Sequence, residues 1–331
     1  MMATAYGEVL RARGAADAQI ETAIRCIRAL ETGLREQGTE LAAAGKKDIG
    51  RYAARMVANG TNTPENFDTL IGYTLWRGLR PQYVALLELV DCHNAMETLR
   101  SIIAKRHGTE ICGQIFREPL PPLGTAEPER YTHTKTITGR MNAVLSPADS
   151  RAAWRTVRHG IADQFWREQD AKERERYAGC QSVGVFLNLK RQERNQHLTE
   201  LHEKGELWYT MELTDEVYDF LTGEVHMQMG EKDGRKGIVV TKVPYQPGRY
   251  LQETNETLKR YFACHCPLIR EAILRGEPVS PDVCYCSLGH ASHFLAGMGL
   301  SHLEGEVMES AVRGDMRCRF IFYLPEDAQE A

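Results

Sequence analysis

Two closely spaced cysteine pairs are the residues of this sequence whose types and spacing best suit chemistry. The stretch YFACHCPLIREAILRGEPVSPDVCYCSLGH, residues 261–290, contains Cys264 with Cys266 and Cys284 with Cys286. In an extended backbone alternate side chains point the same way, so a Cys-x-Cys pair can present both sulfurs to one centre. Two such pairs could supply four thiolates to zinc or, as an alternative, to an iron–sulfur cluster. Small buried thiols without chemistry are the third reading.

A carboxylate and a further cysteine extend this candidate site. The stretch EGEVMESAVRGDMRCRFIFYLP, residues 304–325, predicts a β-hairpin in which Ala311 pairs with Cys318. In that register Glu309 shares the apolar face with Cys318, and Arg317 and Arg319 lie on the opposite face. A carboxylate taken out of water needs a metal, a base or a proton as its partner. A register slipped by one residue would instead leave Glu309 facing solvent.

The residues around the first cysteine pair suggest how it is held and what it could bind. Pro267 is expected to be the first residue of a helix, and Gly276 is expected to end that helix. The sulfurs of Cys264 and Cys266 would then lie near a helix N-terminus, where partial positive charge favours a thiolate. His265 and Arg270 adjoin the cysteines and are candidate contacts for an anionic small molecule, although an arginine on such a helix is more often solvated or salt-bridged.

Composition restricts the classes of protein to consider. The chain has 331 residues, nine cysteines and a formal net charge of −4, without a long basic run, so a nucleic-acid partner is not expected. No stretch of about eighteen apolar residues occurs, so no membrane-spanning helix is expected. The opening residues lack the apolar core of a secretory signal, which predicts a cytoplasmic location where thiols stay reduced. The P-loop, dinucleotide-binding and Gly-x-Ser-x-Gly motifs are absent.

The elements before the cysteines divide into a helical part and a mixed part. Apolar residues three and four apart predict a helix with one buried face: Ile20, Ile24, Ile27, Leu30 and Leu34. A second helical stretch, residues 69–108, is interrupted at Pro81. Residues 117–146 hold four prolines and are the expected linker or long loop. A helix should restart with Ser146 as its cap. The expected regions are 1–145, helical with a proline-rich linker, and 146–331, a mixed α/β domain.

The mixed region predicts both strands and helices. SVGVFLNL, residues 182–189, and LWYTMEL, residues 207–213, have the composition of strands. Thr214 should open a helix over TDEVYDFLTGEVHM, residues 229–245 should turn into a strand, and ETNETLKRYFA should form a helix that leads to the cysteines. The expected fold class is α+β, a helical N-terminal region followed by a mixed α/β domain with an antiparallel sheet.

The segments CYCSLGHASHFLAGMGL, VMES and GDMRCRF, in this order, resemble the 4-vinyl reductase domain. The resemblance covers about the last 50 to 70 residues and implies a small mixed α/β module that holds zinc beneath a small-molecule pocket. It implies Cys286, Glu309 and Cys318 as ligands, and Val312 stands where the family usually has another cysteine. A missing ligand could come from Cys264, Cys266 or Cys284. The aminothiazoline-carboxylate hydrolase group is similar to a smaller degree.

These patterns lead to three functional hypotheses. The first is a cytoplasmic zinc-binding protein with a small-molecule pocket, a metal-dependent hydrolase if one zinc position is open to water. The second is an iron–sulfur or dithiol redox protein that acts on a small molecule, and the third is a ligand-sensing module without catalysis. The resemblance also implies a homodimer as one option. The predicted metal ligands are Cys264, Cys266, Cys284, Cys286, Glu309 and Cys318.

Overall fold

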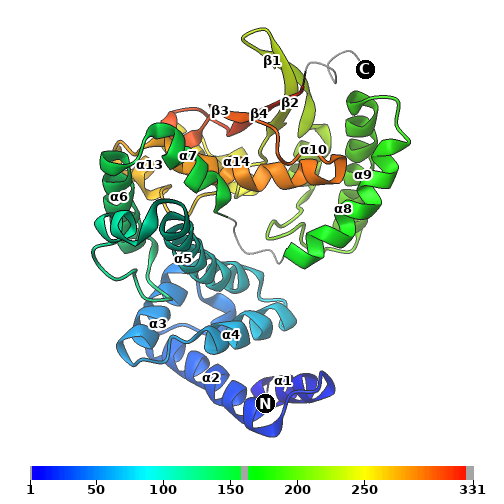
Figure 1. The fold of residues 1–331 in the computed structure, drawn as a ribbon. Coiled ribbons are helices and arrows are strands. Elements are labelled where there is room, and N and C mark those ends of the chain that lie inside the picture. The colour runs from blue at the N-terminus through cyan, green and yellow to red at the C-terminus, as the bar shows by residue number, and fades with distance from the viewer. Residues whose placement is uncertain (1, 158–162, 326–331) are drawn as a thin grey trace. The chain divides into compact units, whose positions relative to one another are not determined.

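The chain folds into two compact units (Figure 1), in a computed structural model that describes residues 2–157 and 163–325. The first unit comprises Met1–Glu97 and Glu118–His133, and the second comprises Thr98–Arg117 and Thr134–Ala331. The predicted boundary at 145 therefore lies inside the second unit. The predicted linker at 117–146 is wrong as well, because helix α6 (Glu127–Val144) occupies most of it. Proline is compatible with the first turn of a helix, and Pro128 lies in that turn.

The first unit consists of helices packed around an apolar core, within the part of it that the structure describes. Helix α2 (Asp17–Glu36) buries the face predicted from its apolar spacing, with Ile27, Leu30 and Leu34 fully buried. Helix α5 (Arg80–Ile115) belongs to both units and is broken at Gly108, whose φ of 86° is left-handed and favours glycine. The other helices of this unit are α1 (Met2–Ala12), η1 (Leu41–Ala43), α3 (Lys46–Ala58) and α4 (Pro64–Trp76).

Helix α5 contains two acidic residues that are buried or half-buried in the first unit, Glu88 and Asp91. Lys46 makes ion pairs with two buried carboxylates, Glu88 at 2.8 Å and Glu127. Burial, together with the charge of Glu88, raises the pKa of the nearby Asp91 carboxyl to about 6. Because this pKa is above the ordinary value, the folded state binds the proton of Asp91 more tightly than the unfolded state does. Its contribution to stability is therefore complete below the unfolded-state pKa of about 3.9 and is lost as the pH rises through the folded-state pKa of about 6.

Asp91→Asn should remove this pH dependence. At pH 7.5 the variant should be more stable than the wild type by about 2–3 kcal/mol, the free energy that corresponds to the raised pKa. At pH 4 the two proteins should differ little, because Asp91 is then neutral. Urea unfolding at both pH values measures the difference, with Glu97→Gln as the exposed control on the same helix. An equal effect of Asp91→Asn at the two pH values would contradict the assignment.

The second unit contains a four-stranded antiparallel sheet of order β1-β2-β4-β3. Its strands are β1 (Met227–Lys232), β2 (Arg235–Thr241), β3 (Gly305–Glu309) and β4 (Arg319–Tyr323). In β2 and β4 alternate residues face one core, and Ile238 lies opposite Phe322 and Val240 opposite Phe320. The chain is thus α+β, as the sequence predicted.

Helices cover that apolar face of the sheet. Helix α14 (Tyr285–Ala291) lies between α7 (Pro147–Thr156) and strand β3, and α9 (Val183–Glu203) packs beside β1 (Figure 1). Three helices begin or end close to the residues predicted: α10 (Asp215–Gly223), α12 (Glu256–Ala263) and α13 (Glu271–Arg275). The remaining helices of this unit are α8 (Asp163–Ala178), α11 (Pro247–Gln252), η2 (Pro281–Cys284), η3 (Ser292–Met298) and η4 (Ala311–Arg313).

Two predicted strands are absent. Residues 182–189 form the first two turns of α9, because the Ser182 hydroxyl accepts the N–H of Val185 and caps a helix. The buried residues of this segment, Val183, Phe186 and Leu187, are spaced for one helix face. Residues 207–213 make a tight turn closed by paired hydrogen bonds between Trp208 and Met211.

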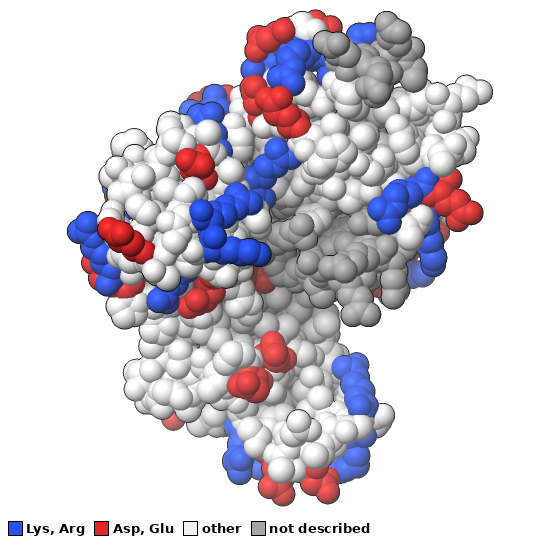
Figure 2. Space-filling model, in the orientation of Figure 1, with Lys and Arg blue, Asp and Glu red and all other residues white. Residues whose placement is uncertain are grey.

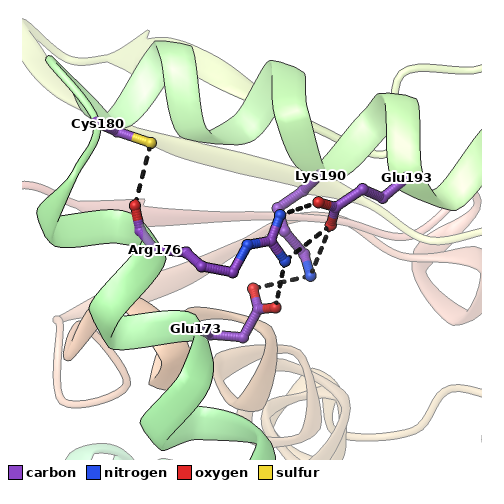
Figure 3. Close-up of polar contacts among 5 residues, drawn as sticks. All are labelled: Glu173, Arg176, Cys180, Lys190 and Glu193. Carbon is purple, nitrogen blue, oxygen red and sulfur yellow. Dashed lines mark hydrogen bonds and ion pairs between the residues drawn. The ribbon is translucent and has the colours of Figure 1, made fainter.

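Ion pairs connect α8 to α9 on the surface of the second unit. Figure 3 shows Arg176 and Lys190 between the carboxylates of Glu173 and Glu193. The Cys180 thiol donates to the Arg176 carbonyl and is remote from the other cysteines in sequence. On the face drawn in Figure 2, basic and acidic side chains are interspersed. No helix of the described residues is long and apolar enough to cross a membrane.

Candidate metal centre

Four cysteines from separate elements come together at one end of the sheet. Cys264 is the C-cap of α12, Cys266 lies in the turn before α13, Cys284 ends η2, and Cys318 immediately precedes β4. The charge of each thiolate would act on the others: Cys318, Cys266 and Cys284 all raise the pKa of Cys264. These four residues, which we call the thiol cluster, are therefore neighbours in space.

Burial controls the protonation of the thiol cluster. Burial is the main cause that raises the pKa of each of its thiols, and it raises that of Cys284 to about 12. The second cause for Cys264 and Cys284 is the charge of Cys318. The thiols are therefore neutral at pH 7 in the absence of a metal. A neutral buried thiol is a poor nucleophile, which argues against a dithiol redox pair.

The backbone around the first pair donates hydrogen bonds to both of its sulfurs. The N–H of Cys266 is hydrogen-bonded to the sulfur of Cys264. The N–H groups of Leu268 and Ile269 lie beside the sulfur of Cys266 and lower its pKa, and the N–H of Ile269 also donates to the Cys266 carbonyl at 3.3 Å. The helix predicted from Pro267 begins later, since α13 starts at Glu271, but a turn at 267–270 already directs its N–H groups towards the sulfur. Such donors stabilise a thiolate without adding charge.

The other two sulfurs of the thiol cluster also have hydrogen-bond partners. The Cys284 sulfur and the Ser310 hydroxyl are 3.1 Å apart, and the N–H of Ser310 donates to the Asp315 carboxylate at 2.7 Å. The N–H of Ala311 is hydrogen-bonded to the sulfur of Cys318. The loop between β3 and β4 thus supplies hydrogen-bond partners to two cysteines that are far apart in sequence.

Cys286 points to a different place. It lies in α14, and the chain is already helical at Cys284, so the two side chains diverge instead of pointing the same way. The Cys286 sulfur donates to the carbonyl of Val157 at 3.6 Å, at the end of α7. The parallel orientation predicted for this second Cys-x-Cys pair is therefore wrong.

The predicted register of the hairpin is also wrong. Strand β3 ends at Glu309 and pairs it with Arg319, after a bulge between Val307 and Glu309. Helix η4 follows, so Ala311 is outside the strand ladder and does not pair with Cys318. The Glu309 carboxylate is half-exposed and accepts a hydrogen bond from Arg319 at 2.8 Å. Since Glu309 has a cationic partner, the physical reason for assigning it to a metal no longer applies.

The two predicted ligand-binding residues both have partners within the fold, and His265 is half-buried whereas Arg270 is fully buried. The His265 ring is hydrogen-bonded through Nε2 to the Val243 carbonyl at 2.5 Å, and burial lowers its pKa well below the ordinary value. Arg270 is fully buried, with its guanidinium 5.0 Å from the ring centre of Tyr245 and 5.4 Å from that of Tyr261. Arg270 is therefore a buried cation rather than the solvated residue that was the alternative.

Sequence reasoning missed Lys242, a buried lysine beside the thiol cluster. It follows β2 directly, and its N–H donates to the Cys318 carbonyl at 2.9 Å. Its ammonium donates to the Ser287 hydroxyl at 3.1 Å, and only 9% of the residue is exposed. A lysine after an apolar strand usually marks the surface, so the local pattern gave no signal for it.

The residue types of the thiol cluster suit a thiophilic metal, but the present positions of their side chains do not form a metal site. Four thiols with N–H and O–H donors around them are the ligand set of a zinc or iron–sulfur site. As they stand, the described residues contain no group of three or more His, Cys, Asp or Glu side chains that could hold a metal ion. Binding of one ion by all four sulfurs would therefore require a change in side-chain positions, and a change of χ1 rotamer redirects a cysteine sulfur without moving its backbone.

The chain matches no family model, no curated protein and no solved structure. The likeness to the 4-vinyl reductase domain therefore stays a prediction from short motifs. The ligand set that it implies differs from the thiol cluster in two residues, since it includes Cys286 and Glu309.

Proposed function

We propose that the second unit is a zinc-stabilised domain in which Cys264, Cys266, Cys284 and Cys318 bind one zinc ion. The observation that carries the proposal is the gathering of four thiols, of which Cys266 is half-buried and the others are buried, each with an N–H or O–H group beside its sulfur. Buried cysteines that only fill space need no such donors. Outer-sphere hydrogen bonds to the ligating atoms are, in contrast, a regular feature of metal sites.

A structural role follows from the number of protein ligands. Four thiolates complete the tetrahedral coordination of zinc, whereas catalytic zinc sites usually have three protein ligands and a water molecule. We therefore favour a structural centre over the metal-dependent hydrolase, which needs an open position. Zinc would connect the turn after α12, the end of η2 and the start of β4.

The raised pKa values of the thiols are compatible with this function. Zinc binds thiolates, so binding must release protons, and metal affinity should increase with pH. The N–H and O–H donors would stabilise the sulfurs once they lose their protons. Reduced thiols are maintained in the cytoplasm, and we place the protein there for this reason. The small organic ligand and the homodimer implied by the resemblance remain predictions.

Elemental analysis of protein purified anaerobically without a metal-affinity step tests the proposal. About one zinc per chain and no visible absorption are expected. Replacement by Co²⁺ should add thiolate-to-metal charge-transfer bands with tetrahedral d–d absorption. Iron with sulfide and a brown colour would replace the zinc centre by an iron–sulfur cluster, and a chain without metal that also fails to bind Co²⁺ would contradict both.

Single substitutions decide which cysteines are ligands. Cys264→Ser, Cys266→Ser, Cys284→Ser and Cys318→Ser should each weaken zinc binding by more than about 100-fold, beyond the usual effect of an outer-sphere residue. Cys286→Ser and Glu309→Gln are the matched controls and should keep one zinc per chain. Competition with a chromophoric chelator measures the affinities. Loss of zinc in the two controls with retention in Cys264→Ser would instead support the ligands implied by the resemblance.

A further inference from the structure

An uncharged stripe runs along the solvent-exposed side of helix α9 in the second unit. Its members are exposed residues three or four positions apart, which places them on one side of the helix: Val185, Asn188, Leu189, Gln192 and Gln196. The opposite side of α9 is buried through Val183, Leu187 and Leu198. The stripe is thus the side of the helix that a partner can reach.

The apolar side chains of the stripe adjoin another exposed apolar side chain, on strand β1. Val185 is 42% exposed, and Leu189 and Met229 are each 39% exposed. A Cβ atom at Gly184 would lie 3.8 Å from Cγ of Met229, so β1 passes directly beside the first turn of α9. Strand β1 is also an edge of the sheet. An exposed apolar patch next to a sheet edge is typical of an interaction surface.

The charged side chains that follow the stripe along α9 have partners within the second unit. Lys190 forms an ion pair with Glu173 of α8 at 2.8 Å, and Glu193 forms one with Arg176 (Figure 3). A partner that docks on the stripe itself therefore meets two apolar and three amide side chains. Neither an acidic nor a basic surface gains attraction from such a stripe.

A second copy of the chain fits this surface. A two-fold axis brings a patch against itself, so any charge on the patch would face the same charge. The absence of charged residues from the stripe removes this repulsion. Amide groups both donate and accept hydrogen bonds, so Asn188, Gln192 and Gln196 can pair with the amides of another copy.

We propose that the stripe and Met229 form the interface of a two-fold symmetric dimer of this chain. The two α9 helices pack antiparallel, with Leu189 opposite Gln192 of the second copy. The stripe is about 17 Å long, so the interface is small and the dimer dissociates on dilution. Helix α9 contributes no cysteine to the thiol cluster, and it lies outside the segments that resemble the 4-vinyl reductase domain, which begin at Cys284.

Exchange of charge at Leu189 tests the two-fold contact. This residue lies near the middle of the stripe, so it is close to its own copy across the axis. Leu189→Lys and Leu189→Glu should each weaken dimerisation by more than about tenfold, because like charges then face each other. An equal mixture of the two variants should dimerise again, since opposite charges meet across the axis. Sedimentation velocity, from low micromolar to several hundred micromolar protein, measures the fraction of dimer.

Two sets of variants serve as controls. Leu258→Lys changes a leucine of α12 that is similarly exposed, at 38%, but lies outside the stripe, and it should dimerise as the wild type does. Gln192→Lys and Gln192→Glu repeat the charge exchange at an exposed polar position, where lysine and glutamate are compatible with the helix. This second pair decides the question if the Leu189 variants do not fold, which urea unfolding of each variant checks.

Each outcome either supports or overturns the interface. A concentration-dependent wild-type dimer, weaker dimerisation of each charge variant and recovery in the mixture support it. A wild type that stays monomeric over the whole concentration range overturns it. A dimer that persists in both charge variants, or charge variants that do not recover on mixing, overturns it as well, because the stripe then does not meet its own copy.

Discussion

Removal of zinc should strongly destabilise the second unit and leave the first unit little changed. Structural zinc contributes about 10–16 kcal/mol of apparent binding free energy in zinc-finger peptides, and this energy is available only to the folded state. The cluster joins three segments that are distant in sequence, at 264–266, 284 and 318, so its loss should free the turn after α12 and the loop before β4. Hydrogen exchange with mass spectrometry, with and without a strong chelator, measures the effect by region.

The pattern of exchange is specific to the proposed centre. Peptides from α12, η2 and β4 should lose protection after chelation, whereas peptides from α2 and α3 of the first unit should not. Addition of Zn²⁺ should restore the protection. The Cys286→Ser variant is the matched control, and its exchange should respond to chelator and zinc as the wild type does. Unchanged exchange around the cluster in zinc-containing protein after complete removal of the metal would show that the centre carries no stability.

Local signals in the sequence predicted the helix ends well. Ser146 caps α7 with Pro147 as the first helical residue, and Thr214 caps α10, as their residue types indicated. Gly276 ends α13 in the left-handed conformation, with φ of 62°. Each of these signals depends on atoms within a few residues of one another, so the neighbouring sequence contains most of the information.

Features that depend on contacts between residues far apart in sequence could not be predicted from such local signals. The bulge in β3 places Glu309 opposite Arg319, and no residue of the neighbouring turn indicates a bulge. Segment 182–189 has the composition of a strand, but its buried side chains pack as a helix face against the sheet core. Lys242 is buried because α14 covers the end of β2, and nothing near it in sequence shows this.

The sequence predicted only part of the candidate site, because the directions of the side chains depend on the backbone conformation. The cysteine spacing directed attention to residues 264–318, where the charges of Cys264, Cys266, Cys284 and Cys318 would act on one another, and the metal site itself stays a prediction. The argument from alternate side chains required an extended backbone, which the chain does not have at Cys286. Residue types thus identified the donors, and the backbone conformation decided which of them face one another.

The contact of α14 with α7 gives the second large expected effect. A Cβ atom at Gly289 would overlap the backbone carbonyl oxygen of Arg155 in α7. Cys286 is one turn earlier on the same face of α14, and its sulfur contacts Val157 at the end of α7. Glycine at 289 therefore allows the two backbones to approach closely. Gly289→Ala must move α14 away from α7, and Cys284, adjoining the start of α14, should move with it.

Gly289→Ala should lower the free energy of unfolding by about 3 kcal/mol or more, at the upper end of overpacking effects because the clash is with backbone. It should also weaken zinc binding, because Cys284, a proposed zinc ligand, would be displaced together with α14.

Gly139→Ala in α6 is the matched control. A Cβ there meets no atom within 4 Å, so this variant should be as stable as the wild type or more stable by about 0.5–1 kcal/mol. Urea unfolding and chelator competition on both variants measure the two effects. Equal stability of the two alanine variants would mean that α14 and α7 are not packed backbone to backbone, and unchanged zinc affinity in a destabilised Gly289→Ala would separate Cys284 from the position of α14.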